Sequence, residues 1–194
     1  YARNAQIIQV NIDQAELEKG TLRDPINICM DSKEFIEQLN QILVPATLQW
    51  SGWTNRWKPW LEQCQKWKEK YPVCLDSYKE EKDYVNSYYF VDCLSALAQP
   101  EDIIVTDMGF AFQNTHQGWK TKKGQRILTN CGLAPMGWGL PSAIGSAVAT
   151  GKRVILITGE GGLMMNIQEL ATVMHHKLNI KIFVLNNGGY LTIK

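Results

Sequence analysis

Residues 153–194 constrain the fold of this chain more than any other stretch. Residues 154–158 form a short apolar, β-branched run, the pattern of a fully buried parallel strand, and residues 180–185 form a second one. Between them, apolar residues recur at helical spacing over residues 166–178. In a right-handed βαβ unit, both strands end at the same edge of the sheet. The polar turns that follow them should therefore lie side by side.

These two turns carry the residue types of a metal and phosphate site. A Gly-Glu-Gly-Gly turn occupies residues 159–162, and an Asn-Asn pair occupies residues 186–187. Glycines allow a tight turn and bring backbone N–H groups against a ligand. Carboxylate, amide and carbonyl oxygens suit a hard cation such as Mg²⁺. We therefore predict that a divalent cation holds a diphosphate between Glu160 and Asn187.

The glycine turn alone has little specificity, because a turn without a ligand explains residues 159–162 equally well. It is not a dinucleotide fingerprint, which would need a glycine where Met164 stands, and the chain has no G-K-[ST] phosphate loop. The pairing with the asparagines at the end of the next strand is what favours a ligand site.

Composition narrows the class of protein. The 194 residues are 45% hydrophobic and 20% charged with a formal net charge of +1, which favours a packed core and gives no support for a nucleic-acid or membrane-surface partner. No apolar run reaches the ~20 residues that span a bilayer, and no signal peptide opens the sequence. The five cysteines form no CxxC pair, so we predict reduced thiols and a cytoplasmic location. The sequence starts within a strand-like pattern and stops just past Asn187, so we expect a piece of a longer polypeptide.

The first 43 residues read as the C-terminal edge of an α/β domain. We expect a strand at residues 6–12, a turn and short helix at 13–19, and a helix at 35–43. Asp31 and Glu34 have the spacing of a capping box before that last helix.

Residues 44–83 read as a linker rich in tryptophan. Five tryptophans fall at helix-like spacings interrupted by Pro45 and Pro59, and lysines lie among them: Trp50, Trp53, Trp57, Trp60 and Trp67. Such a stretch could stack on single-stranded nucleic acid, or it could be an amphipathic connecting helix. Glutamates and aspartates balance the lysines, which favours the connecting helix.

Residues 84–194 read as a second α/β domain. Strand and helix patterns alternate along it, which is typical of a parallel, doubly wound sheet. The expected elements are a helix at 86–98, a strand at 103–106, a turn at 107–109, a helix and loop at 111–123, a strand at 126–129, a glycine-rich turn at 131–141 and a helix at 142–150.

The paired turns resemble the cofactor motif of thiamine-diphosphate enzymes, in which Gly-acid-Gly precedes an Asn-Asn pair that closes the next strand. The sequence is most similar to the acetolactate synthase-like group. The segments that carry this likeness are GGLMMNIQELATV, GLAPMGWGLPSAIGSA and QIIQVNID. The resemblance covers most of the chain and implies the thiamine-diphosphate-binding fold, preceded by the edge of a central domain.

The resemblance also implies roles for individual residues. Glu160, Asn187 and the carbonyl of Gly189 would bind Mg²⁺. Backbone N–H groups of the glycine turn would bind the diphosphate. Met136, unless it is an ordinary core methionine, would bend the cofactor, with the backbone of Ala134 beside the aminopyrimidine. The full cofactor set is Gly109, Ala134, Met136, Gly159, Glu160, Gly161, Gly162, Asn187 and Gly189.

Two departures from the family pattern stand out. The family has aspartate where this chain has Glu160, and it has a polar pair where this chain has Phe110 and Ala111. Both changes predict weaker or altered cofactor binding and favour a specialised member of the group. His175 and His176 fall near a helix end, where a cation suits the helix dipole, so we assign them no metal or catalytic role.

The implied activity is decarboxylation of a 2-keto acid such as pyruvate, followed by carboligation, by a homodimeric or homotetrameric transferase or lyase. The activating glutamate of the family belongs to an N-terminal domain, so these 194 residues alone should be inactive. Some synthases of this group carry FAD, which nothing in this sequence indicates. Two alternatives stay open: another thiamine-diphosphate decarboxylase or carboligase in specialised metabolism, and a degenerate, non-catalytic homologue.

Overall fold

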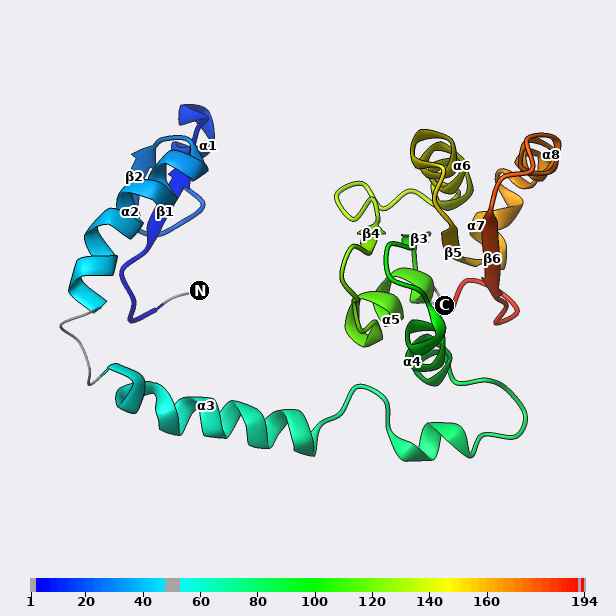
Figure 1. Cartoon of the computed structure of the whole chain (residues 1–194), viewed down its shortest axis with the longest axis horizontal. Helices are drawn as coiled ribbons and strands as arrows, with labels where there is room; N and C mark the ends of the chain where they lie inside the picture. The colour runs from blue at the N-terminus through cyan, green and yellow to red at the C-terminus, as the bar shows by residue number, and fades with distance from the viewer. Residues whose placement is uncertain (1–2, 48–52, 192, 194) are drawn as a thin grey trace. The chain divides into compact units, whose positions relative to one another are not determined.

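The computed structural model describes residues 3–47, 53–191 and 193 (Figure 1). By its contacts the chain divides into two compact units, Tyr1–Lys70 and Tyr71–Lys194, and each is described by itself. This boundary falls inside the segment 44–83 that the sequence suggests as a linker. The division into 1–43, 44–83 and 84–194 stays a prediction. None of the helices in the described ranges is long and apolar enough to cross a membrane.

The first unit contains a parallel pair of strands, β1 (Ile8–Asn11) and β2 (Ile26–Cys29). The expected strand and short helix are confirmed as β1 and α1 (Gln14–Leu17), and the Asp13 side chain caps α1 by accepting from the N–H of Ala15 at 2.9 Å. Strand β2 was not predicted, because its four residues give too short a pattern for a period to be recognised.

Two helices follow, and both are longer or less broken than the sequence suggests. Helix α2 (Ser32–Thr47) starts earlier than predicted because Asp31 Oδ1 accepts hydrogen bonds from the N–H groups of Lys33 and Glu34. Helix α3 (Trp53–Lys70) contains Pro59, so the predicted interruption there is wrong. A proline removes one helical hydrogen bond, and the residues on either side continue the helix.

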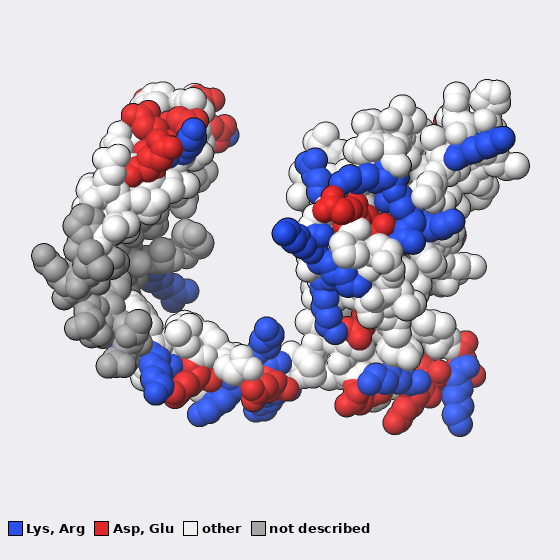
Figure 2. Space-filling view, in the orientation of Figure 1, with Lys and Arg blue, Asp and Glu red and all other residues white. Residues whose placement is uncertain are grey.

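The surface of α3 supports the connecting-helix interpretation over a nucleic-acid platform. Helix α3 has five basic and two acidic residues, and acidic side chains interrupt the basic ones in the face shown in Figure 2. Trp60 and Trp67 pack edge to face with ring centroids 5.6 Å apart. Trp50 lies outside the described residues.

The second unit is built on a four-stranded parallel sheet in the order β4-β3-β5-β6, which confirms the predicted doubly wound α/β fold. Its strands match the predicted ones to within one residue: β3 (Ile103–Thr106), β4 (Arg126–Leu128), β5 (Val154–Gly159) and β6 (Ile180–Leu185). Its longer helices are α4 (Ser87–Leu97), α5 (Phe110–Gly118) and α6 (Gly139–Thr150).

Helices cover both faces of this sheet, as Figure 1 shows. On one face, Val91 of α4 and Ala111 of α5 pack in a core cluster with Ile104 of β3. On the other face, Leu140 of α6 packs with Val105 of β3 and with Val154 and Leu156 of β5. Alternate residues of each buried strand therefore serve the two cores, as the continuous apolar runs indicate.

Helix α6 approaches the sheet closely at Gly139. An added Cβ there would lie 2.9 Å from Asp107 Cβ and 3.0 Å from Leu156 Cδ1, whereas at Gly145 of the same helix nothing lies within 4 Å. Gly139→Ala should therefore lower the free energy of unfolding by about 1–2 kcal/mol through overpacking. The matched variant Gly145→Ala should raise it by about 0.5 kcal/mol, because alanine favours the helix. Urea unfolding measures both, and equal effects would contradict the close packing.

The helix predicted over residues 166–178 is shorter in the structure, where a 3₁₀ turn η2 (Ile167–Glu169) runs directly into helix α8 (Leu170–His175). A separate helix, α7 (Glu160–Met164), precedes it. The interruption falls at Asn166, whose backbone leaves the helical region at φ −135° and whose side chain donates a hydrogen bond to the carbonyl of Gly137. The end at His175 is explained by Lys177, which adopts the left-handed conformation at φ 49°.

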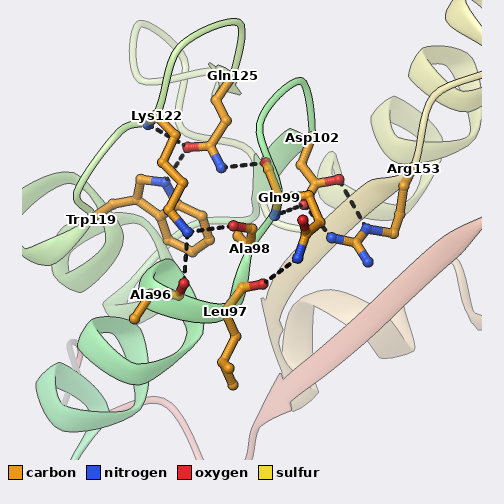
Figure 3. Close-up of polar contacts among 9 residues, drawn as sticks. All are labelled: Ala96, Leu97, Ala98, Gln99, Asp102, Trp119, Lys122, Gln125 and Arg153. Atoms are coloured by element: carbon orange, nitrogen blue, oxygen red, sulfur yellow. Dashed lines mark hydrogen bonds and ion pairs between the residues drawn. The ribbon is translucent and has the colours of Figure 1, made fainter.

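A polar network ties the amino ends of β3 and β5 to the end of α4, as Figure 3 shows. Asp102, which is 4% exposed, forms a two-point ion pair with Arg153 through bonds of 2.9 Å and 2.5 Å. The hydrogen bond to Asp102 raises the pKa of Arg153. Gln125 accepts from the indole N–H of Trp119 and donates to the carbonyl of Gln99. The network holds together the amino ends of these strands, whereas the predicted cofactor site lies at their carboxyl ends.

Lys122 completes this network at the carboxyl end of α4. Its ammonium group donates to the carbonyls of Ala96 and Ala98, at 2.6 Å and 2.5 Å. Helix ends leave carbonyls unpaired and attract cations. Lys122→Met should therefore lower the free energy of unfolding by about 1–2 kcal/mol. Lys123→Met, at the exposed neighbour, should change it by less than about 0.5 kcal/mol in the same urea titration.

Candidate functional site

A cavity of about 300 Å³ opens where the carboxyl ends of β3, β5 and β6 meet. Its lining includes every residue that the sequence suggests for cofactor binding: Gly109, Ala134, Met136, Gly159, Glu160, Gly161, Gly162, Asn187 and Gly189. These residues come from four separate segments of the chain. The turns that follow β5 and β6 therefore lie together, as the sequence predicts.

The register of β5 and β6 brings the two polar turns together. Gly159 pairs with Leu185, so Glu160 and the Asn-Asn pair begin at the same level of the sheet. Glu160 Oε1 accepts a hydrogen bond of 2.8 Å from the N–H of Gly189. The carboxylate thus reaches the turn that would supply the amide and carbonyl oxygens.

The predicted glycine turn is wrong in one respect: helix α7 starts at Glu160, so Gly161 and Gly162 lie in the first helical turn. The residues fold this way because Gly159, in an extended conformation at φ −84° and ψ 160°, acts as the N-cap. In the described part of the chain, no side chain caps this end of α7. N–H groups in a first helical turn have no partner within the helix, so they are free to bind an anion.

The start of α5 forms another part of the cavity wall. Gly109 precedes it at φ 76°, a left-handed conformation that favours glycine. Phe110, 37% exposed, and the buried Ala111 also line the cavity. The wall is therefore apolar where the related family has a polar pair.

The loop before α6 contributes Ala134 and Met136. Ala134 adopts a left-handed φ of 49°, and its N–H donates to the carbonyl of Asn130 at 2.8 Å. Met136 is half-buried and lines the cavity, which is compatible with a role against a ligand.

Among the cavity residues that were not predicted, Asp107 and Tyr190 lie close to predicted ones. Asp107, 2% exposed at the end of β3, accepts from the N–H groups of Met108 and Gly137 and from the hydroxyl of Thr158. The ring of Tyr190 lies against Gly161, where an added Cβ would be 2.5 Å from Cε1. An acid directly after a short, β-branched strand was the signal for Asp107. Nothing in the sequence marks Tyr190.

The donor set at the cavity fits a divalent cation held jointly with a diphosphate. It offers a carboxylate in Glu160, an amide in Asn187 and free backbone N–H groups. Across the described ranges, no group of three or more His, Cys, Asp or Glu side chains is placed to hold a metal. A metal at this cavity would therefore take most of its ligands from amide, carbonyl and phosphate oxygens. The cavity lining contains no histidine.

Comparison with known proteins agrees with this geometry. Residues 107–194 match the family described as "Thiamine pyrophosphate enzyme, C-terminal TPP binding domain". The chain is 34% identical over 192 residues to acetolactate synthase 2, chloroplastic, of Nicotiana tabacum, an alignment that covers 96% of this chain and 27% of the relative. It is 35% identical over 193 residues to acetolactate synthase 2, chloroplastic, of Zea mays, covering 96% and 28%.

Acetolactate synthase, chloroplastic, of Arabidopsis thaliana is 31% identical over 192 residues, again with 96% of this chain and 27% of the relative covered. The chain thus spans little more than a quarter of the length of the curated relatives it matches. Their names place these relatives in chloroplasts and give no support to the predicted cytoplasmic location. Residues 107–194 belong to the family of C-terminal binding domains of thiamine pyrophosphate enzymes, and the chain is similar to acetolactate synthases along nearly its whole length.

Proposed function

We propose that this chain supplies the diphosphate and metal half of a thiamine-diphosphate site in an acetolactate synthase-like enzyme. The observation that carries the proposal is the convergence of the nine predicted cofactor residues on one cavity. The hydrogen bond between Glu160 and Gly189 supports it further, because it holds the carboxylate at the turn that follows β6.

Different residues would bind the metal, the diphosphate and the organic part of the cofactor. Glu160, Asn187 and the carbonyl of Gly189 would hold Mg²⁺, which would neutralise negative charge on the diphosphate. The first-turn N–H groups of Gly161 and Gly162 bind the diphosphate oxygens at the positive end of α7. Met136 would contact the organic part of the cofactor. When bound, thiamine diphosphate supplies the carbanion stabilisation that decarboxylation needs, and the protein supplies binding and orientation.

The substrate we propose is a 2-keto acid such as pyruvate, decarboxylated and then joined to an acceptor carbonyl. The names of the relatives, which are acetolactate synthases, support this choice. The protein would act as a homodimer or homotetramer, with the activating glutamate on a domain that these residues do not include. Cytoplasmic location remains our proposal, and cell fractionation or imaging of the tagged full-length protein tests it. We propose no role for FAD.

Product analysis with the full-length protein tests this function. Pyruvate alone should give acetolactate, and an added aldehyde or second keto acid should divert the product. Release of acetaldehyde without carboligation would favour a decarboxylase instead. The isolated 194 residues should show no turnover, because the activating glutamate is absent from them.

A degenerate, non-catalytic homologue is the second candidate. Phe110 and Ala111 make the cavity wall apolar beside Gly109, where side chains could otherwise bind phosphate. Glu160 also carries one methylene more than the aspartate of the family pattern, and Mg²⁺ tolerates distorted geometry poorly. Absence of thiamine diphosphate binding by the full-length protein would favour this candidate.

A further inference from the structure

Gly137, the residue directly after Met136, is held by hydrogen bonds on both of its backbone polar groups. Its N–H donates to the carboxylate of Asp107, at 3.2 Å and 3.1 Å from the two oxygens. Its carbonyl accepts from the side-chain amide of Asn166. These two partners come from different segments, the end of β3 and the break between α7 and η2.

The fit around Gly137 is too tight for any larger residue. An added Cβ would lie 2.7 Å from Asn166 Nδ2 and 2.9 Å from Met165 Cβ. Its φ of 84° also favours glycine. Gly137 is buried, and the carboxylate of Asp107 is anchored in turn by the hydroxyl of Thr158 at 3.1 Å. The backbone at Gly137 therefore has one well-defined position.

Asn166 has no other evident reason to interrupt the helix. Its backbone departs from helical geometry between α7 and η2, and its side chain uses that departure to reach the loop before α6. The break thus joins the segment that carries Glu160 to the segment that carries Met136. A displacement of the loop that carries Met136 would therefore strain or break this hydrogen bond.

We propose that Asp107 and Asn166 clamp Gly137 and thereby fix the position of Met136 against the thiamine part of the cofactor. This inference rests on the proposed function, since it assumes that Met136 contacts the bound cofactor. Both clamp residues are positioning residues. Asn166 acts on the organic part of the cofactor through Met136, and Glu160 and Asn187 act on its diphosphate.

The two parts of the cofactor can be separated with inorganic pyrophosphate, which has the diphosphate and lacks the thiamine. In the full-length protein with Mg²⁺, Asn166→Ala should weaken thiamine diphosphate about tenfold, the effect of losing one hydrogen bond that orders the loop. Pyrophosphate affinity should stay within about twofold of wild type. Titration calorimetry measures both ligands.

Matched variants complete the test. Gln168→Ala, at an exposed position two residues later, should leave both affinities unchanged. The isosteric Asn166→Asp, which places a carboxylate against the Gly137 carbonyl, should weaken thiamine diphosphate at least as much as alanine does. Glu160→Ala should weaken both ligands together.

Three results would overturn the clamp alone, and a fourth would overturn the proposed function with it. Unchanged thiamine diphosphate affinity in Asn166→Ala would show that Asn166 does not position Met136. An equal loss for both ligands would show that Asn166 supports the whole site instead. Equal affinities of the wild-type protein for pyrophosphate and thiamine diphosphate would show that the thiamine part, and hence Met136, contributes nothing to binding. A wild-type protein that binds neither ligand would instead refute the proposed function itself, and the clamp with it.

Discussion

Replacing Asn187 with alanine should abolish Mg²⁺-dependent binding of thiamine diphosphate, with a loss of affinity of about 100-fold or more. Asn187 lines the cavity beside Glu160 and Gly189, and the Glu160 carboxylate is already held 2.8 Å from the Gly189 N–H. Without the Asn187 amide, Glu160 is the one side-chain ligand left at the site. Mg²⁺ would bind there weakly, because this ion needs a near-ideal octahedron of oxygen ligands. Titration with the cofactor at saturating Mg²⁺ measures the loss.

The adjacent asparagine provides a matched control. Asn186 Oδ1 accepts a hydrogen bond of 3.1 Å from the N–H of Gly188, and its side chain does not line the cavity. Asn186→Ala should therefore weaken binding only a few-fold, by loosening the turn. If Asn186→Ala lost as much affinity as Asn187→Ala, or if neither lost any, the assignment of Asn187 as a metal ligand would be wrong.

Gly162→Ala should be the most destabilising substitution at the cavity. An added Cβ would lie 2.9 Å from Asp107 Cγ, closer still to Oδ2, and 3.3 Å from Thr158 Oγ1. Asp107 is buried and cannot move without breaking its bonds to Gly137 and Thr158. We expect the free energy of unfolding to fall by about 3 kcal/mol, from overpacking and from a disturbed buried carboxylate. Urea unfolding of the purified protein measures the change.

A substitution at the neighbouring Gly161 serves as the control, because it changes helix propensity in α7 without a close contact to Asp107. At Gly161 the three atoms nearest to the added Cβ all belong to the ring of Tyr190, which is 51% exposed and can swing away. Gly161→Ala should therefore change the free energy of unfolding by less than about 1 kcal/mol. Similar losses for the two variants would contradict the close contact between α7 and Asp107.

The sequence predicts the central strands of the second unit well because β3 and β5 are buried on both faces and read as continuous apolar runs. Strand β6 is only half-buried, but its run is also largely apolar, and all three strands agree with their predicted limits to within one residue. The parallel order then follows from strand and helix alternation, and it places the two polar turns at one edge. The gathering of candidate residues around Glu160 was predictable for this reason.

What the sequence could not supply depends on contacts between distant segments. The break at Asn166, between α7 and η2, has no signature in the sequence, because it depends on the carbonyl of Gly137. Asp107 likewise looks like a turn residue until its buried partners are known. The family resemblance implies a helix N-terminus at Gly161 and Gly162, but the apolar spacing places the helix start only at Asn166, because glycines give no helical pattern; in the structure α7 begins at Glu160.

Titration calorimetry of the full-length protein with thiamine diphosphate, with and without Mg²⁺, tests the central claim most directly. We predict heat of binding with one cofactor per chain in the presence of Mg²⁺, little binding after chelation, and loss of binding in Glu160→Ala. Absence of binding in wild type, or binding that neither chelation nor Glu160→Ala affects, would contradict the claim that this cavity is the diphosphate and metal half of the site.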